Sequence, residues 1–259
     1  NRISSCQTTP GYVDNGVVSG TNYYYVVRAE DVSATSGGGV CGGIEDSNVV
    51  ERSAQATGPD TVSFSDNAEA GLGQWALDGT GGGSNFAVVS TQANSPTQSF
   101  FVPDPAVTSS RTLTFATPVT LPANPSTLEF YHRYATEAGY DGGVLEYSLD
   151  GSTWTGILGA QGTVPANAAR FVSGGYNATM NTSGAFGAVA AWHGSFNTAW
   201  TRTVVNLADF AGRSVSFRFR FGSDNSVSGT GWWIDDVRIY YGSSCQAGSP
   251  DQVYQNGFE

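Results

Sequence analysis

The chain has 259 residues, of which 39% are hydrophobic and 12% aromatic, while only 13% are charged. All 11 basic residues are arginines, and together with 22 acidic residues they leave a net charge of −11. This composition excludes a disordered chain, and an acidic balance without a basic cluster argues against nucleic-acid or anionic-membrane partners. No apolar run approaches the roughly 18 residues that a membrane-spanning helix needs.

The first 53 residues contain short β-patterned runs separated by glycines. The run 21–29 alternates aromatic and β-branched side chains with others, which predicts a strand whose alternate residues face a core. This run resembles the last third of a fibronectin type III module, and the resemblance implies a partial module. The matching residues are Gly20, Thr21, Tyr23, Tyr25, Val27 and Ala29.

The chain has only three cysteines, Cys6, Cys41 and Cys245. Cys6 and Cys41 enclose one hairpin-sized unit, so we predict a disulfide between them in an exported protein, with Cys245 left over. Three unrelated small residues are the alternative. The first five residues do not read as a signal peptide, and we expect a fragment or processed product of a longer chain.

A small, polar stretch over residues 54–60 contains a Gly-Pro breaker and predicts a linker between two β-patterned regions. The second region, 61–242, is followed by a tail, 243–259. It carries antiparallel β-patterned runs joined by Gly, Pro, Asn and Ser turns, which predicts an all-β antiparallel sandwich of the jelly-roll type. Strands are expected over 113–117, 127–134, 143–148, 200–206, 214–221 and 232–240, with a helical turn over 207–211.

Two local patterns within this region have a clear physical meaning. Asp150-Gly151 follows an alternating strand and is a strong hairpin signal, after which Trp154 is expected to return to the core. Arg218 and Arg220 alternate with phenylalanines, so the arginines should share one sheet face and the aromatic rings the other.

Three segments, 130–154, 205–220 and 231–237, resemble the jelly-roll accessory domain of secreted bacterial peptidases. The motifs that match are Phe-Tyr-His-Arg-Tyr with Tyr-Asp-Gly-Gly-Val-Leu-Glu-Tyr-Ser, Val-Asn-Leu-x-x-Phe-Ala-Gly, and Gly-Trp-Trp-Ile-Asp-Asp-Val. Such domains accompany immune-inhibitor-A-type, fungalysin-type and subtilisin-like peptidases, and they are distant relatives of the MAM adhesion domain. The resemblance implies a secreted, extracellular accessory region whose partner is the catalytic domain of the same parent chain.

No catalytic group of residues is predicted. His132 and His193 are too far apart in sequence for a zinc-peptidase motif, and no nucleophile elbow precedes a helix. We interpret His132 as a hydrogen-bonded structural residue rather than a general base. A carboxylate pair for glycoside hydrolysis stays open, since its separation is a three-dimensional quantity.

The acidic residues instead suggest calcium, which prefers six to eight oxygen ligands. If the first and last strands of the sandwich pair, the start and the end of the region would form one site. Its ligands would be Asp66, Glu69, Asp235 and Asp236. The alternative for the two adjacent aspartates is that one caps backbone amides while the other is solvated.

A second candidate site consists of Glu137 and Asp141, directly before Gly142-Gly143, where a simple Asp-Gly-Gly turn is equally compatible with the sequence. Asp104 and Asp224 are weaker candidates. Sugar stacking is considered for the tryptophans, with Trp232 and Trp192 named as ligand-binding candidates, although core packing is the usual fate of tryptophan.

Taken together, the sequence predicts a non-catalytic, calcium-stabilised accessory region of a secreted bacterial hydrolase, with a peptidase as the expected parent. It would aid folding, positioning, or attachment to a protein substrate or surface. A carbohydrate-binding or cell-adhesion module that recognises glycan is the alternative.

Overall fold

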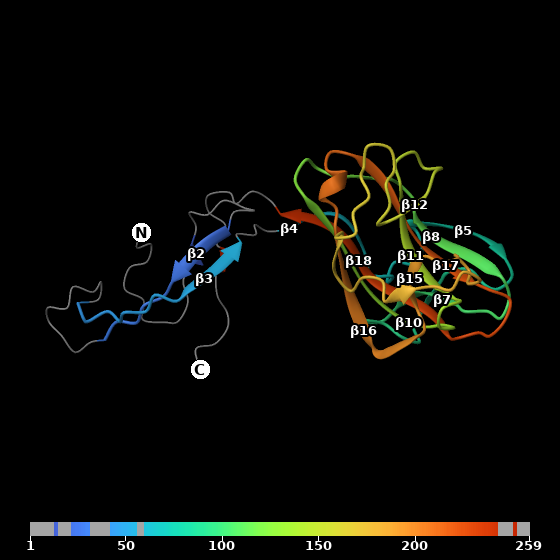
Figure 1. Ribbon diagram of the computed structural model, residues 1–259, viewed down its shortest axis with the longest axis horizontal. Helices are drawn as coiled ribbons and strands as arrows, with labels where there is room; N and C mark the ends of the chain where they lie inside the picture. Colours follow the sequence, from blue (N-terminus) through green and yellow to red (C-terminus); the bar gives the residue numbers. More distant parts are fainter. Residues whose placement is uncertain (1–12, 15–21, 32–41, 56–59, 243–250, 253–259) are drawn as a thin grey trace. The chain divides into compact units, whose positions relative to one another are not determined.

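The computed structural model describes residues 13–14, 22–31, 42–55, 60–242 and 251–252 (Figure 1). The chain divides into two compact units: residues 1–61 with 242–259, and residues 62–241. Within the described residues, no helix is long and apolar enough to cross a membrane.

The smaller unit contains two short antiparallel pairs of strands. Strand β2 (Asn22–Val26) pairs with β3 (Glu51–Gln55), and β1 (Val13–Asp14) pairs with β19 (Asp251–Gln252). The strand expected over residues 21–29 is present only as the shorter β2, and residues 27–29 lie outside it. The stretch 54–60 that we predicted as a linker contributes its first two residues to β3 and its last to β4, and residues 56–59 lie outside the described residues.

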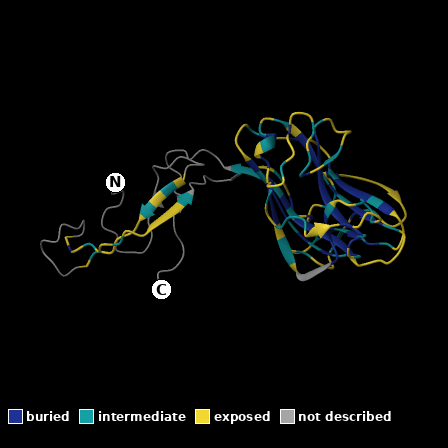
Figure 2. Ribbon diagram, in the orientation of Figure 1, coloured by how far each residue is buried: buried dark blue, intermediate teal, exposed yellow. Residues whose placement is uncertain are grey.

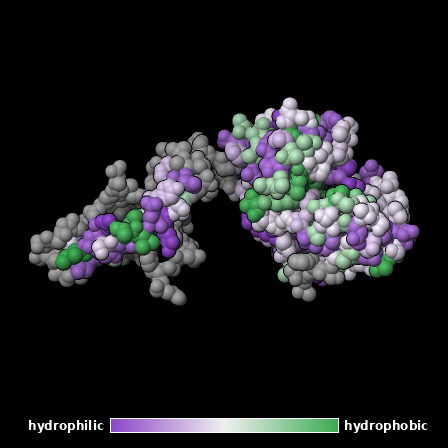
Figure 3. Space-filling model, in the orientation of Figure 1, coloured by the Kyte–Doolittle hydropathy of each residue, from purple (hydrophilic) through white to green (hydrophobic). Residues whose placement is uncertain are grey.

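The β2–β3 hairpin buries little of its apolar surface. The described residues of these two strands are all exposed or half-buried (Figure 2), and a hydrophobic area covers part of the unit in Figure 3. The exposed apolar side chains of the unit are Tyr24, Val26, Val27, Ile44, Val49 and Val50. A two-stranded ribbon is only marginally stable by itself, and the fibronectin-type resemblance stays a prediction.

The larger unit is a sandwich of two antiparallel sheets, which confirms the predicted fold class (Figure 1). The first sheet has the order β13 (Phe171–Ser173), β16 (Ser195–Asn206), β10 (Ser126–Ala135), β18 (Gly231–Gly242), β7 (Ser99–Pro103) and β6 (Ala87–Val89), and β4 (Asp60–Asp66) also pairs with β18. The second has the order β14 (Ala178–Thr179), β15 (Ala190–His193), β11 (Gly142–Ser148), β17 (Ser214–Ser223), β8 (Ser109–Phe115) and β5 (Trp75–Gly81). At its margins β12 (Thr155–Gly156) pairs with β11 and β9 (Val119–Thr120) with β17. The helical turn is the 3-10 helix η1 (Ala208–Phe210).

The core lies between the two sheets and is rich in aromatic side chains (Figure 2). Along β17 the three phenylalanines 217, 219 and 221 are fully buried, while Arg218 and Arg220 lie on the opposite face, as the alternation predicts. Phe219 meets Phe130 of the facing sheet at 4.9 Å and Trp232 at 5.8 Å between ring centroids. These edge-on contacts join the two sheets.

A buried polar group at the centre of this core is satisfied by two neighbours. His132 on β10 is fully buried, and burial lowers its pKa to about 3, so the ring is neutral. The indole of Trp232 donates to His132 Nδ1 at 3.1 Å, which leaves the proton on Nε2 for Thr203 Oγ1, also at 3.1 Å. Thr203 in turn donates to the Gly174 carbonyl. The structural role predicted for His132 thus matches its position.

Candidate functional site

The acidic residues that lie together come from loops at one end of the sandwich. Glu137 and Asp141 are in the loop from β10 to β11, and Asp224 follows β17. Strands β11 and β17 are paired with Gly142 opposite Gly222, so the ends of both strands bring Asp141 and Asp224 side by side. Asp104 follows β7, whose last residue pairs with the first residue of β18 at this same end.

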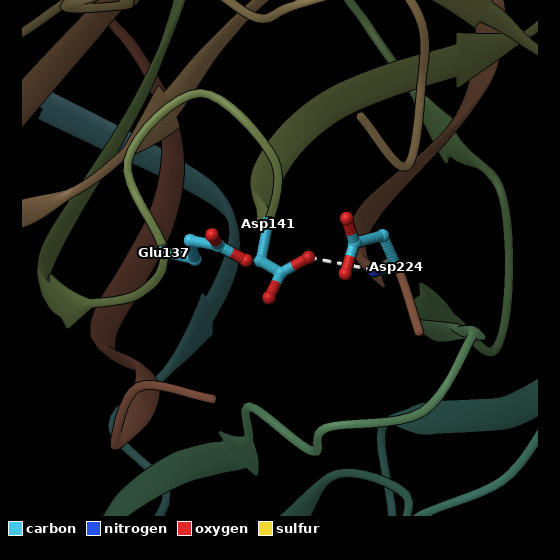
Figure 4. Close-up of side chains that lie close together, drawn as sticks. All are labelled: Glu137, Asp141 and Asp224. Atoms are coloured by element: carbon cyan, nitrogen blue, oxygen red, sulfur yellow. Dashed lines mark hydrogen bonds between the residues drawn. The ribbon is translucent and has the colours of Figure 1, made fainter. Parts of the chain in front are cut away.

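The three carboxyl groups of Glu137, Asp141 and Asp224 each offer an oxygen within 4.8 Å of the others (Figure 4). Asp141 Oδ1 accepts a 2.6 Å hydrogen bond from the Asp224 amide, which Figure 4 shows as a dashed line. Asp104 joins the group because its Oδ2 accepts from the amides of Glu137 and Gly229. Its carboxyl is near enough to Asp141 for the two to hydrogen-bond when one carries a proton. We call these four residues the carboxylate cluster.

Three oxygens of the carboxylate cluster have no hydrogen-bond partner. Asp104 Oδ1, Glu137 Oε2 and Asp141 Oδ2 are inaccessible to solvent and contact no donor among the described residues. Asp141 as a whole is 0% exposed and Asp104 is 4% exposed. Buried polar atoms are almost always paired, and each exception in a native structure needs an explanation such as an ion.

The electrostatics of the carboxylate cluster favour proton or cation uptake. Burial raises the pKa of Asp141 to about 8, partly opposed by the Asp224 amide and reinforced by the charge of Asp104. Burial likewise raises the pKa of Asp104, against the hydrogen bond from Gly229, and that of Glu137, with the charges of Asp224 and Asp104 adding to the effect. Three shifts in the same direction mean that four negative charges are not tolerated here without a counter-charge.

The ligand chemistry of the carboxylate cluster matches a hard divalent cation. Every candidate ligand is a carboxylate oxygen, and Ca²⁺ combines such ligands with backbone carbonyls and water. His193 packs beside the loop, but its Nδ1 accepts a 2.9 Å hydrogen bond from the Gly139 amide. Its Nε2 is buried without a hydrogen-bond partner, but it is not among the ligand atoms that group together in the described part of the chain, which are those of Glu137, Asp141 and Asp224. This all-carboxylate set disfavours zinc.

The other acidic set predicted from the sequence is not assembled in this way. Asp66 accepts hydrogen bonds from the Ala68 amide and from the side chains of Gln74 and Trp75. Glu69 accepts from the amides of Thr97 and Gln98.

The two adjacent aspartates of that set hold the neighbouring loop. Asp235 accepts from the amides of Asn94, Ser95 and Asp236, and Asp236 accepts from the Asn94 side chain. Burial raises the pKa of Asp235 to about 6, although its three amide donors oppose the shift. Asp235 thus caps backbone amides, which is the alternative that the sequence left open.

The two tryptophans named as ligand-binding candidates are both core residues. Trp192 and Trp232 are each 1% exposed, and their ring centroids lie 5.9 Å apart. Trp192 also donates to the carbonyls of Gly174 and Gly175. Neither ring can therefore stack on a sugar, because the patterned strands direct both into the core. The predicted disulfide cysteines Cys6 and Cys41, and Cys245, lie outside the described residues.

Sequence reasoning missed an aromatic residue on the outer face of the second sheet. Trp154, which we expected in the core, is half-buried, and the guanidinium of Arg218 lies 4.2 Å from its ring centroid. Arg220 lies 4.2 Å from the ring of Phe186 in the same way, and both arginines bind Glu146. We call Trp154, Phe186, Arg218, Arg220 and Glu146 the arginine–aromatic face. The alternating arginines were the signal in the sequence that could have located it.

Comparisons with known proteins return distant similarities to other β-sandwich domains. No protein-family model and no curated protein matches the sequence. The solved structures that resemble it include TmCBM61 in complex with β-1,4-galactotriose, with 14% identity, a TM-score of 0.41, and coverage of 68% of this chain and 94% of that one. The CBM22-1 xylan-binding domain from Paenibacillus barcinonensis Xyn10C shows 11% identity and a TM-score of 0.41, covering 72% and 97%.

An adhesin domain is similar to the same degree. A cleaved adhesin domain of Lys-gingipain from Porphyromonas gingivalis shows 12% identity and a TM-score of 0.42, covering 72% of this chain and all of that one. These neighbours are carbohydrate-binding and adhesin domains, and at such identities and TM-scores the likeness concerns the β-sandwich fold alone.

Proposed function

We propose that residues 62–241 form a non-catalytic binding domain that is stabilised by Ca²⁺ at the carboxylate cluster. The observation that carries the proposal is the set of three buried, unpaired carboxylate oxygens on Asp104, Glu137 and Asp141. A divalent cation between Glu137, Asp141 and Asp224 would satisfy the unpaired oxygens of Glu137 and Asp141 and offset the repulsion that Asp104 adds beside them. Asp224 would supply the third carboxylate of the group shown in Figure 4.

The position of the carboxylate cluster suggests what the ion does. Asp104 follows a strand of the first sheet, Asp224 follows a strand of the second, and the loop with Glu137 and Asp141 connects the two sheets. A cation held there would tie three loops together at one end of the sandwich. Its role is thus structural: it would hold the loops, and with them the two sheet ends, in one arrangement.

Calcium titration by isothermal calorimetry tests this site directly. The chain, freed of metal with EDTA, should bind one Ca²⁺ in the sandwich, and Asp141→Asn should abolish that binding. Glu69→Gln is the matched control, since Glu69 is an exposed acid of the other predicted set. Retained binding in Asp141→Asn together with loss in Glu69→Gln would move the site to the first and last strands and refute the proposal.

For the biological role, we propose that the chain is an accessory region of a secreted hydrolase, with a peptidase as the expected parent enzyme. The support is the similarity of segments 130–154, 205–220 and 231–237 to the accessory domains of such enzymes. The chain itself should then show no hydrolysis of casein or gelatin. Turnover that disappears on substitution of a single acidic residue would overturn the non-catalytic assignment.

The second candidate function is a carbohydrate-binding or cell-adhesion module. One specific observation favours it: the arginine–aromatic face presents hydrogen-bond donors and an indole ring on the surface of a sheet. This function does not exclude a cation site, because the carboxylate cluster lies at the end of the sandwich and not on this face.

A further inference from the structure

The arginine–aromatic face has a floor built from two strands. Arg218 and Arg220 are both on β17 and point away from the core, and Glu146 of β11 is paired opposite Arg218. Glu146 Oε2 accepts from Arg218 Nε at 2.6 Å, and Oε1 accepts from Arg220 Nε at 3.0 Å and Nη2 at 2.7 Å. One carboxylate thus holds two guanidinium groups in fixed orientations.

The arginines keep donors that the protein does not use. Arg218 Nη1 and Nη2 and Arg220 Nη1 make no hydrogen bond to any residue that the structure describes. The two side chains are only 19% and 28% exposed, so these donors are partly desolvated at the surface. Oriented, partly dehydrated donors bind an acceptor at a smaller entropic cost than flexible surface groups do.

The Trp154 ring is held in place by an unusually well-bonded turn. Asp150 accepts from the amides and hydroxyls of both Ser152 and Thr153, and from the Ser148 hydroxyl. These bonds lower the pKa of Asp150, with the Thr153 amide as the largest cause. On the other side of the turn, Gln161 donates to the Thr153 carbonyl at 2.7 Å. Thr153, which precedes Trp154, is therefore held by Asp150 through its amide and hydroxyl and by Gln161 through its carbonyl.

Two rows of mostly small side chains extend the face across the second sheet. Across β8 and β5, the row of Arg218 continues through Thr114 and Ala76, and the row of Arg220 through Thr112 and Asp78. The charge of Asp78 acts on Arg218, so Glu146 and Asp78 match the two arginines, and Asp150 in the turn before Trp154 adds a third carboxylate. An exposed carboxylate thus adds hydrogen-bond acceptors beside the free donors.

We propose that the arginine–aromatic face, together with the strip over β8 and β5, binds a neutral polysaccharide. Pyranose rings offer an apolar C–H face to the indole of Trp154 and hydroxyl groups that both donate and accept. Arg218 and Arg220 would donate to these hydroxyls, and Asp78 would accept from them. The carboxylates of Glu146, Asp78 and Asp150 disfavour an acidic polymer, and the site deepens the carbohydrate-binding candidate above, on which it rests.

The experiment is affinity gel electrophoresis of the whole chain in gels containing xylan, galactan, mixed-linkage β-glucan or polygalacturonate. We expect at least one of the three neutral polymers to retard the chain. Trp154→Ala should weaken that retardation by roughly tenfold or more, because truncation of an aromatic anchor removes a dominant contact, and Arg220→Ala should weaken it too. Tyr131→Ala is the matched control, since Tyr131 lies on the outer face of the other sheet, and its retardation should equal that of the wild type.

Three results would overturn the proposal: no retardation by any neutral polymer, retardation by polygalacturonate alone, or equal retardation of the wild type and Trp154→Ala. A loss in Tyr131→Ala would transfer the site to the other sheet. Calcium titration of Trp154→Ala distinguishes a failure of the polysaccharide proposal from a failure of the calcium proposal. A variant that still binds Ca²⁺ is folded at the carboxylate cluster, so its loss of retardation reports on the polysaccharide face alone.

Discussion

Replacement of Asp141 by Asn should stabilise the metal-free protein, although the residue is completely buried. Without a cation, burial places the pKa of Asp141 at about 8 in the folded chain, against 3.8 as its ordinary value. At pH 7 the folded state must hold a proton that the unfolded state releases. One pKa unit corresponds to about 1.4 kcal/mol, so this protonation costs at most about 4 kcal/mol.

Asn carries no charge in either state and escapes this cost. Its side-chain oxygen can still accept from the Asp224 amide, and its amide group can donate to Asp104. Allowing for imperfect hydrogen bonds, we expect a gain of about 1–3 kcal/mol, which for a domain of this size raises the Tm by roughly 2–10 °C.

Calcium should reverse the order of the two proteins. At a free concentration of 1,000 Kd, binding stabilises the wild type by about 4.1 kcal/mol, or roughly 8–16 °C in Tm, which exceeds the gain of the variant. Asp141→Asn lacks one ligand and should respond little. Thermal unfolding followed by circular dichroism, in EDTA and in millimolar CaCl2, measures all four values. If Asp141→Asn unfolds at a lower temperature than the wild type in EDTA, the buried carboxyl group is not under the repulsion described here.

Three further predictions concern the same sandwich. Above pH 7, where His132 is neutral in the folded and the unfolded state, the metal-free protein should lose up to about 1.4 kcal/mol of stability per pH unit until Asp141 has titrated near pH 8, because the pKa of Asp141 is higher in the folded than in the unfolded state. Urea unfolding at pH 7 and pH 8.5 checks this loss, and Asp141→Asn should make the stability less dependent on pH. Gly143→Ala would place a methyl group 2.5 Å from the Trp232 ring and should destabilise by about 1–3 kcal/mol, measured in the same way, and an unchanged midpoint would contradict the close packing. His132→Leu should cost about 1–3 kcal/mol by leaving the Trp232 indole without its acceptor, and a variant as stable as the wild type in urea would show that the buried network contributes nothing.

The elements that the sequence revealed are those with long alternation. Strands β10 and β17 were predicted to within about two residues, because their buried side chains alternate with polar ones. Short strands at the sheet margins, such as β6 and β14, were missed, since two or three residues carry no readable period.

The sites were less accessible to sequence reasoning. Glu137 and Asp141 are close in sequence and were named as one site. Asp104 and Asp224 were named only as weaker, separate candidates, because they reach this site through the pairing of β18 with β7 and of β11 with β17. The Asp150-Gly151 turn was predicted correctly, yet the destination of Trp154 was wrong. Strand β12 begins only after Trp154 and is two residues long, so the indole follows the turn onto Arg218.

The carboxylate cluster also bears on how the sandwich comes apart. Asp104 and Asp224 are about 120 residues apart in the chain. Bringing them together again after the sheets have separated costs loop-closure entropy. An ion bound at the carboxylate cluster would act as a reversible cross-link, so the sheets could not separate at this end until the ion departed. Calcium would then lengthen the lifetime of the native state against unfolding and proteolysis, a gain in kinetic persistence beyond its effect at equilibrium.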